Sequence, residues 1–278
     1  MIIIFLILIL AVPPFCFAQE REESLDGFSL VQYEDEGAKK WELSGRSAEV
    51  EEGKVKIDEV SALTYGEDAT LKLKAREGTF DREEDLVHLE KDVVAKTTDG
   101  TMLSTDSLDW DAKTKNVSTD VDVTIKRPGL ELDGTGANVD LDEKTAELKH
   151  DVTANITSAA PDYLRTAPVR RSLGEGGNNE QRTTITCDGP LELNYKKNRA
   201  TFRNNVKVVD REGTIYADRI DVLFSPEGRK IKCVAAKGNV RIVNGENITY
   251  SDKAIYLVDQ GRVILPRRPK LVIQSESQ

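Results

Sequence analysis

The strongest constraint on the fold is a short motif, an aspartate or asparagine followed by valine, that recurs through most of the chain. Its copies begin at Asp92, Asp122, Asp151, Asn205 and Asn239, so they lie 30, 29, 54 and 34 residues apart. A second apolar element precedes the copies, for example at 103–106, 132–134 and 215–218. A unit of this length cannot bury its own apolar face, so successive units must stack to enclose an interior.

Between these motifs the hydrophobic residues alternate with polar ones, as at 54–57, 71–75, 121–125 and 240–242. A period of two places every apolar side chain on one face of a β-strand. Turn signals such as Asp99-Gly100 and Asn244-Gly245 separate the segments, and no convincing helical period follows residue 20. The chain is therefore predicted to be all-β, either as two facing antiparallel sheets or as a parallel β-helix. The irregular repeat spacing favours the facing sheets.

Residues 1–18 differ in character from the rest of the chain. An uninterrupted apolar run from Met1 to Val12 is followed by Pro13-Pro14 and ends at Ala18, before a polar stretch. This pattern is typical of a secretory signal peptide cleaved after Ala18. Because no Lys or Arg precedes the run, an uncleaved membrane anchor is the alternative. A lipoprotein modified at Cys16 is disfavoured, since small residues are missing before it.

The longest gap between motifs divides the exported chain into two modules, 19–157 and 183–278. Residues 158–182 contain Pro161, Pro168 and a glycine cluster at 174–177, and little periodicity, which indicates a flexible linker. The first module carries 18 basic and 35 acidic residues, a net charge of -17. The second carries 17 basic and 11 acidic residues, a net charge of +6.

The inward apolar positions of both modules have two interpretations: a plain hydrophobic core, or an open groove between the sheets that accepts acyl chains. Apolar burial contributes roughly 25 cal/mol per Å² whichever partner supplies the surface. The candidate groove residues are Trp41, Leu43, Ile57, Leu73, Phe80, Leu89, Val93, Leu103, Leu108, Trp110, Val123, Ile125, Leu132, Val139, Ile185, Leu193, Phe202, Val206, Ile215, Val222, Phe224, Val240 and Ile242.

Two cysteines, Cys187 and Cys233, remain once the leader is removed. In an oxidising compartment they form either a disulfide or two small apolar positions on inward faces. With only two histidines in the chain, none close to a cysteine, we expect no zinc site, and we expect no other metal or cofactor.

Acidic pairs recur at Asp109/Asp111, Asp120/Asp122 and Asp140/Asp142, and are interpreted as solvated residues at strand ends rather than as a Ca²⁺ or acid–base site. His88 is expected to point outward. No nucleophile–base arrangement and no phosphate-binding glycine loop is visible, so we do not expect an enzyme. The acidic net charge of -10 argues against nucleic-acid binding.

Several segments resemble known envelope proteins. Residues 28–33, 40–49, 75–81, 87–93 and 99–110 resemble the periplasmic LptC family of lipopolysaccharide export, over about residues 26–157. Residues 200–208 and 235–242 look like the related OstA/LptA-like module, over about 183–273. The chain departs from LptC proteins in two ways, because those usually keep a membrane anchor and usually end after one module.

The resemblance implies an open, twisted β-jelly-roll of two stacked modules. It also implies a periplasmic bridge that carries lipopolysaccharide from an inner-membrane ABC transporter complex towards the outer membrane. Other OstA/LptA-like modules would join it by edge-strand pairing. The basic residues Arg267, Arg268 and Lys270 would contact headgroups or a partner, or belong to a solvated tail. The rival hypothesis is a secreted β-repeat protein that binds or cleaves envelope polysaccharide. Outward aromatic platforms or clustered carboxylates would favour that rival, and the sequence shows neither.

Overall fold

The computed structural model describes residues 23–272, except 35–36, 52, 66–69, 99, 160–179, 212, 226–230, 261 and 267–268. Within this part the chain is almost entirely β-strand, with one short 3-10 helix at Val258–Gln260. The prediction of an all-β fold is confirmed. The predicted leader, residues 1–18, lies outside the described residues.

Nine strands form the first part of the structure. They are β1 (Glu23–Tyr33), β2 (Lys39–Glu51), β3 (Lys54–Tyr65), β4 (Thr70–Asp81), β5 (Leu86–Thr97), β6 (Met102–Asp111), β7 (Asn116–Arg127), β8 (Leu130–Asp140) and β9 (Thr145–Ala159). Eight strands follow. They are β10 (Glu180–Cys187), β11 (Leu191–Asn194), β12 (Arg199–Val209), β13 (Thr214–Phe224), β14 (Ile231–Asn244), β15 (Asn247–Leu257), β16 (Arg262–Ile264) and β17 (Lys270–Val272).

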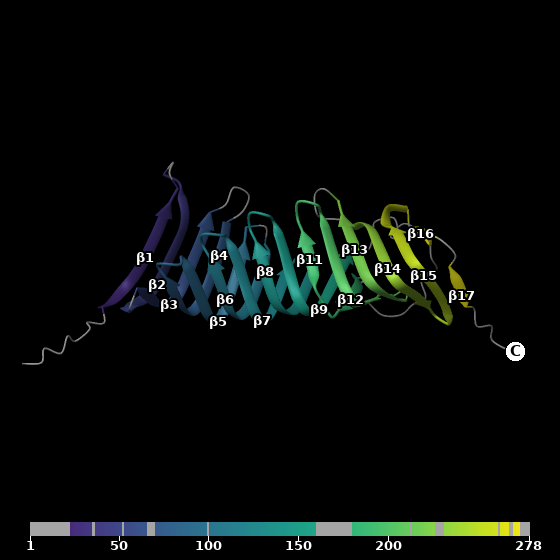
Figure 1. Ribbon diagram of the computed structural model, residues 1–278, viewed down its shortest axis with the longest axis horizontal. Helices are drawn as coiled ribbons and strands as arrows, with labels where there is room; N and C mark the ends of the chain where they lie inside the picture. The colour runs from purple at the N-terminus through teal and green to yellow at the C-terminus, as the bar shows by residue number, and fades with distance from the viewer. Residues whose placement is uncertain are drawn as a thin grey trace, which may run out of the picture.

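All seventeen strands belong to one antiparallel sheet, and they stack along the long axis of the molecule nearly in sequence order (Figure 1). The exceptions are β10 and β11, which both lie between β9 and β12, and β16 and β17, which both pair with β15. The predicted modules meet where β9 pairs with both β10 and β11. Leu148 lies opposite Leu191, and Ala154 lies opposite Ile185. The sheet therefore runs from one module into the other without a break in its hydrogen bonding.

The segment predicted as a linker, 158–182, lies mostly outside the described residues. Its two ends are strand: β9 continues to Ala159 and β10 begins at Glu180, and these two residues lie opposite each other. The alternation of apolar and polar residues did not predict these strand ends. They are strand because the backbones of β9 and β10 pair there.

The recurring Asp/Asn-Val motif marks the point where the strands bend. The pairing register shifts near mid-strand in most pairs from β4 to β15, for example between Glu90 and Val93. Four of the five motif residues before valine have positive φ angles, between 47° and 54°: Asp92, Asp151, Asn205 and Asn239. Asp and Asn tolerate this left-handed conformation better than other non-glycine residues. The next residue, always valine, is almost completely buried in all five copies.

Each strand bends at its bulge, near its middle, so the whole sheet folds over along this line. The two halves of the folded sheet, one on each side of the line of bends, then face each other. Trp41 lies near one end of the strands, whereas Phe80 and Trp110 lie near the hairpins at the opposite end. The ring of Trp41 nevertheless packs edge-on against both, with centroids 5.8 Å and 5.9 Å away. Only contact across the interior brings these rings together. The structure is thus the open, twisted β-jelly-roll expected from the resemblance.

The left-handed backbone conformation at the bend can be tested at Asp151, whose φ is 51°. We expect Asp151→Gly to leave the free energy of unfolding nearly unchanged, because glycine adopts this conformation without steric cost. Asp151→Val should lower it by about 1–2 kcal/mol. Urea denaturation of the two variants measures the difference, and equal stabilities would contradict the role assigned to the motif.

Of the two interpretations of the cysteines, the structure supports inward apolar positions for Cys187 only. Both are free thiols. Cys187 is buried in the interior as expected, but Cys233 lies opposite Leu223, which is exposed on the outer face. Two strands, β12 and β13, separate β10 from β14, so strand spacing alone puts the cysteines at least about 14 Å apart. That distance is far beyond disulfide reach.

Candidate functional site

The inward apolar surface between the two halves of the folded sheet is the candidate functional site, here called the trough. Its floor follows the line of bends, where Val93, Val123, Val152, Val206 and Val240 are buried one after another. The trough continues through the β9–β10 and β9–β11 pairs into the second module. It therefore runs along the whole stacked sheet rather than forming two separate cores.

Every predicted groove residue contributes to this interior, but exposure changes along it. The ten candidates from Trp41 to Trp110, on β2–β6, are all buried. Six later candidates are only partly buried: Ile125, Val139, Leu193, Ile215, Phe224 and Ile242. All six lie near strand ends, at the lips of the trough. The lips are thus sealed in the first strands, where Trp41, Phe80 and Trp110 meet, and partly open from β7 onward.

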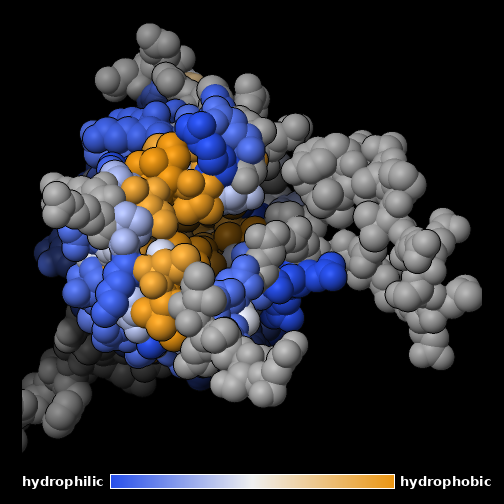
Figure 2. Space-filling view, turned by 90° about the vertical axis from the view of Figure 1, so that its right-hand side faces the viewer, coloured by the Kyte–Doolittle hydropathy of each residue, from blue (hydrophilic) through white to orange (hydrophobic). Residues whose placement is uncertain are grey.

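The trough is uncovered at its C-terminal end. Val234 of β14 points into the trough, and Tyr256 of β15 lies opposite it. Val263 of β16 lies opposite Tyr256 in turn, so both side chains continue the inward face. Tyr256, Val263 and, on β17, Leu271 are 39%, 52% and 58% exposed. The end-on view shows a band of hydrophobic residues between hydrophilic borders (Figure 2). The sequence did not single out these three residues, because alternation alone does not show where a stack of strands ends.

The C-terminal basic residues are only partly visible. Arg267 and Arg268 lie outside the described residues. Lys270 is exposed on β17 and lies opposite Tyr250 of β15. The structure thus places Lys270 on the outer face, on a different side of the sheet from the trough.

The acidic pairs have structural roles at several positions. Asp111 accepts hydrogen bonds from the backbone N–H groups of Lys113 and Thr114, and Asp140 accepts one from Glu143, so each closes a hairpin turn. The backbone N–H of Thr114 helps to lower the pKa of Asp111. The pair Asp120/Asp122 was placed wrongly at a strand end. It lies at the mid-strand bend of β7, where the register shifts.

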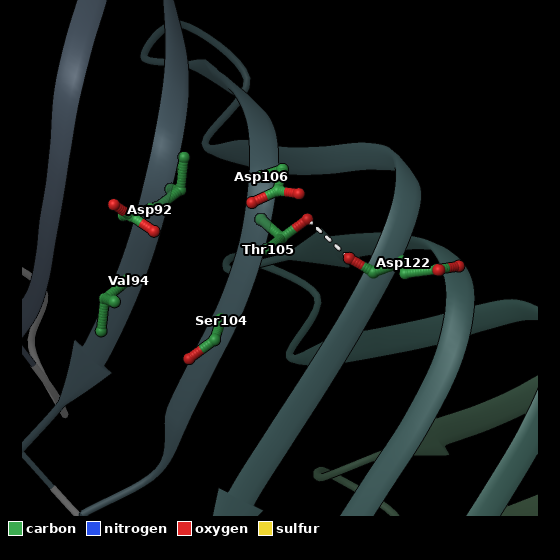
Figure 3. A pocket seen from close by; sticks show the side chains of 7 residues that line it. Asp92, Val94, Ser104, Thr105, Asp106 and Asp122 are labelled. Atoms are coloured by element: carbon green, nitrogen blue, oxygen red, sulfur yellow. Dashed lines mark hydrogen bonds between the residues drawn. The ribbon is translucent and has the colours of Figure 1, made fainter.

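A shallow depression on the outer wall is lined by Asp92, Val94, Ser104, Thr105, Asp106 and Asp122 (Figure 3). It arises where β5, β6 and β7 bend, and the Thr105 hydroxyl donates a 2.8 Å hydrogen bond to the Asp122 carbonyl there. Asp92 forms an ion pair with Arg76. Val93, whose side chain is buried at the floor of the trough, also lines the depression. Across the described ranges, no group of three His, Cys, Asp or Glu side chains is arranged to hold a metal ion.

His88 lies on the outer face, half-buried, with its Nδ1 2.6 Å from Asp109 Oδ1 and its Nε2 3.4 Å from Glu90. Burial lowers the pKa of His88, but the hydrogen bond and charge of Asp109, with those of Glu90, raise it above its ordinary value. The raised pKa means that the protonated form stabilises the fold.

We therefore expect wild type to be more stable than His88→Gln in mild acid. The advantage should be complete below the unfolded-state pKa of about 6.5 and fade as the pH rises through the raised folded-state pKa. It should stay below about 1 kcal/mol, because the side chains of His88 and Asp109 are each more than a third exposed and water screens their interaction. Urea midpoints measured against pH test this. Asp109→Asn should remove most of the effect, and a pH-independent difference would contradict it.

A charged cluster on the outer face of the second module was missed by sequence reasoning. Asp221 is buried, with 5% of its side chain exposed, and it accepts hydrogen bonds from Arg199, Thr201, Arg219 and Lys237. Burial would raise the pKa of Asp221, but these bonds hold it far below its usual range. The donors come from three strands, β12, β13 and β14, so only the sheet register brings them together.

Comparisons with known proteins decide the family. A family profile described as "Lipopolysaccharide-assembly, LptC-related" matches residues 18–157, half of the chain. The chain belongs to the LptC-related family. A second profile, described as "LptA/(LptD N-terminal domain) LPS transport protein", matches residues 184–277. This LptC-related chain therefore joins an LptC-type and an LptA-type domain, the combination of a periplasmic lipopolysaccharide-transport bridge, and the family is one of transport components rather than enzymes.

A search of curated proteins finds no match. Among solved structures, one alignment is to LptH, the LptA-homologous periplasmic component of the lipopolysaccharide transport device of Pseudomonas aeruginosa. It has 13% identity, covers 74% of this chain and 95% of that chain, and has a TM-score of 0.20. The described residues include no helix with the length and apolar character to span a membrane.

Proposed function

We propose that the trough carries the acyl chains of lipopolysaccharide while its sugars and phosphates stay in water. The observation that carries the proposal is the unbroken inward apolar face, which passes from the LptC-type to the LptA-type domain through the strand pairs β9–β10 and β9–β11. A lipid bound by this face would not have to re-enter water at the junction. All 23 candidate groove residues would then belong to one path.

The sealed and open parts of the trough have different roles in this proposal. Over β2–β6 the two halves pack on each other, so acyl chains can enter only when the halves separate. Because apolar burial is worth about the same against protein or hydrocarbon, roughly 25 cal/mol per Å², replacing one contact by the other costs little. From β7 onward the lips are already partly open, and the exposed end at Tyr256, Val263 and Leu271 is where the cargo would leave.

The partners follow from the two ends of the sheet. Among the described strands, β1 pairs only with β2, and β16 and β17 pair only with β15, so both ends present unpaired backbone groups. Unpaired edges bind further strands readily. We propose that the β1 edge docks on the inner-membrane ABC transporter complex, and that the C-terminal edge extends the bridge by pairing with another LptA-type module. Residues 1–18 would direct export or hold the chain at the inner membrane.

Photo-crosslinking during lipopolysaccharide flux tests the proposal. A crosslinking amino acid is placed at inward Leu103, Val222 or Ile242, and at their outward neighbours Ser104, Leu223 and Val243 as matched controls. We expect ATP-dependent adducts with lipopolysaccharide from the inward positions only. Equal adducts from both faces, or none from the inward positions while flux continues, would show that the trough is a closed core.

A further inference from the structure

One row of side chains runs along the outer face, parallel to the long axis, with one residue on every strand except β11 and β16. In the second module its members are Lys207, Tyr216, Arg241, Tyr250 and Lys270, on β12, β13, β14, β15 and β17. Cation and tyrosine alternate without exception. With neighbouring strands about 4.8 Å apart, the five positions extend over about 19 Å. We call these five residues the cation–tyrosine row.

The residues of the row contact one another rather than any carboxylate. The guanidinium of Arg241 lies 4.0 Å from the centroid of the Tyr216 ring, and the ammonium of Lys207 lies 5.9 Å from it. Tyr250 is 42% exposed. Within the part of the chain that the structure describes, Lys207, Arg241 and Lys270 form no ion pair. The row therefore presents three uncompensated positive charges between aromatic faces.

The first module supplies an internal comparison, because the same register row continues there. Its members are Ser29, Ser44, Ser61, Lys74, Val94, Ser104, Thr124, Asp133 and Thr153, followed by Thr186 of the second module. None of these is aromatic, and one is basic. Most lysines of the first module are instead paired with carboxylates, as Lys91 is with Glu77 and Lys115 with Asp142. The alternation is thus specific to the second module and is not imposed by the fold.

We propose that the cation–tyrosine row binds an anionic sugar chain laid along the outer face. An arginine stacked on an aromatic ring keeps the N–H groups at the edge of its guanidinium free. These groups can donate two hydrogen bonds to one phosphate or carboxylate. A tyrosine ring offers a flat apolar face for a sugar ring and a hydroxyl for its polar groups. Alternating the two along a line suits a ligand that alternates charge with ring faces.

A membrane surface fits the row less well. Peripheral membrane binding combines basic residues with large apolar side chains that enter the acyl region. The cation–tyrosine row has no such side chain, and Tyr256, Val263 and Leu271 belong to the trough on the other face. Val209 and Leu223 are exposed on the outer face of β12 and β13 but are separate, medium-sized side chains outside the row. The sugar chain can come from two sources with the same chemistry: the phosphorylated core of the cargo lipid, or the cell wall.

The test uses the whole purified chain and probes without acyl chains, so its result is independent of the trough. The probes are deacylated, phosphorylated core oligosaccharide, soluble cell-wall glycan fragments, and phosphatidylglycerol vesicles, each titrated by calorimetry. We expect one of the two sugar probes to bind, with affinity falling at higher salt. The triple variant Lys207→Ala, Arg241→Ala, Lys270→Ala should bind it at least tenfold more weakly. Tyr250→Ser should weaken binding severalfold, and Tyr250→Phe should bind nearly as wild type.

Lys74→Ala is the matched control, since Lys74 occupies the same row in the first module without aromatic neighbours. It should bind as wild type, and all variants should retain the wild-type circular dichroism spectrum. Binding of the core oligosaccharide identifies the cargo headgroup as the source, and binding of wall fragments alone identifies the cell wall. Failure of both sugar probes, stronger binding to the vesicles, or a triple variant that binds the sugar as wild type does would overturn the proposal.

Discussion

Replacing Trp41 by alanine is expected to lower the free energy of unfolding by about 3–5 kcal/mol. Trp41 is 4% exposed and packs edge-on against Phe80 and Trp110 across the interior. It is therefore the side chain that joins the two halves of the sheet where the lips are sealed. Its removal leaves a large cavity and breaks two aromatic contacts, each worth about 0.5–1.5 kcal/mol beyond buried area.

Trp41→Phe separates packing from hydrogen bonding at the same position. The indole Nε1–H is buried and donates to no group among the described residues. Phenylalanine keeps most of the ring contact and leaves no partner unsatisfied, so it should cost less than about 1.5 kcal/mol. Urea or thermal unfolding of both variants measures the contrast. If phenylalanine were as damaging as alanine, the indole N–H would have a partner and the interior would be arranged differently.

Replacing Asp221 by alanine should lower the free energy of unfolding by about 3 kcal/mol. Removing one member of a buried charged network typically costs about 3–5 kcal/mol, because the remaining charges lose their partner. The lower end applies because Arg199, Arg219 and Lys237 are about a third exposed and can turn towards water. The buried hydroxyl of Thr201 also loses its acceptor. Glu192→Ala is the matched control: it breaks the exposed pair with Arg203, at a cost below about 1 kcal/mol.

The Asp221 network also predicts a dependence on pH. Because the pKa of Asp221 is lowered in the folded state, its stabilisation is complete above the unfolded-state pKa of about 3.9. It is lost as the pH falls from there through the lowered folded-state pKa. The stability difference between wild type and Asp221→Asn should therefore be constant near neutral pH and shrink below about pH 4. A difference that grows in acid would contradict the assigned network.

Local pattern was sufficient for the strands, their inward faces and the family resemblance. Alternation with a period of two identifies the buried face of a strand wherever one face meets the core, which is why every predicted groove residue lies in the interior. The Asp/Asn-Val motif was visible as a repeat, but its meaning was not. Only the backbone shows that the residue before valine adopts a left-handed conformation at the bend.

The features that depend on the register between strands could not be predicted from the sequence. Asp221 meets Arg199 and Lys237, and Tyr216 meets Arg241, because the sheet sets neighbouring strands at one particular offset. The same holds for the sealing of the lips by Trp41, whose partners come from 39 and 69 residues further along the chain. The sequence by itself determined which side of each strand is apolar, because that is a property of alternate residues on one backbone. Tertiary structure alone decided which strands face each other, since cross-sheet contacts depend on where the strands bend.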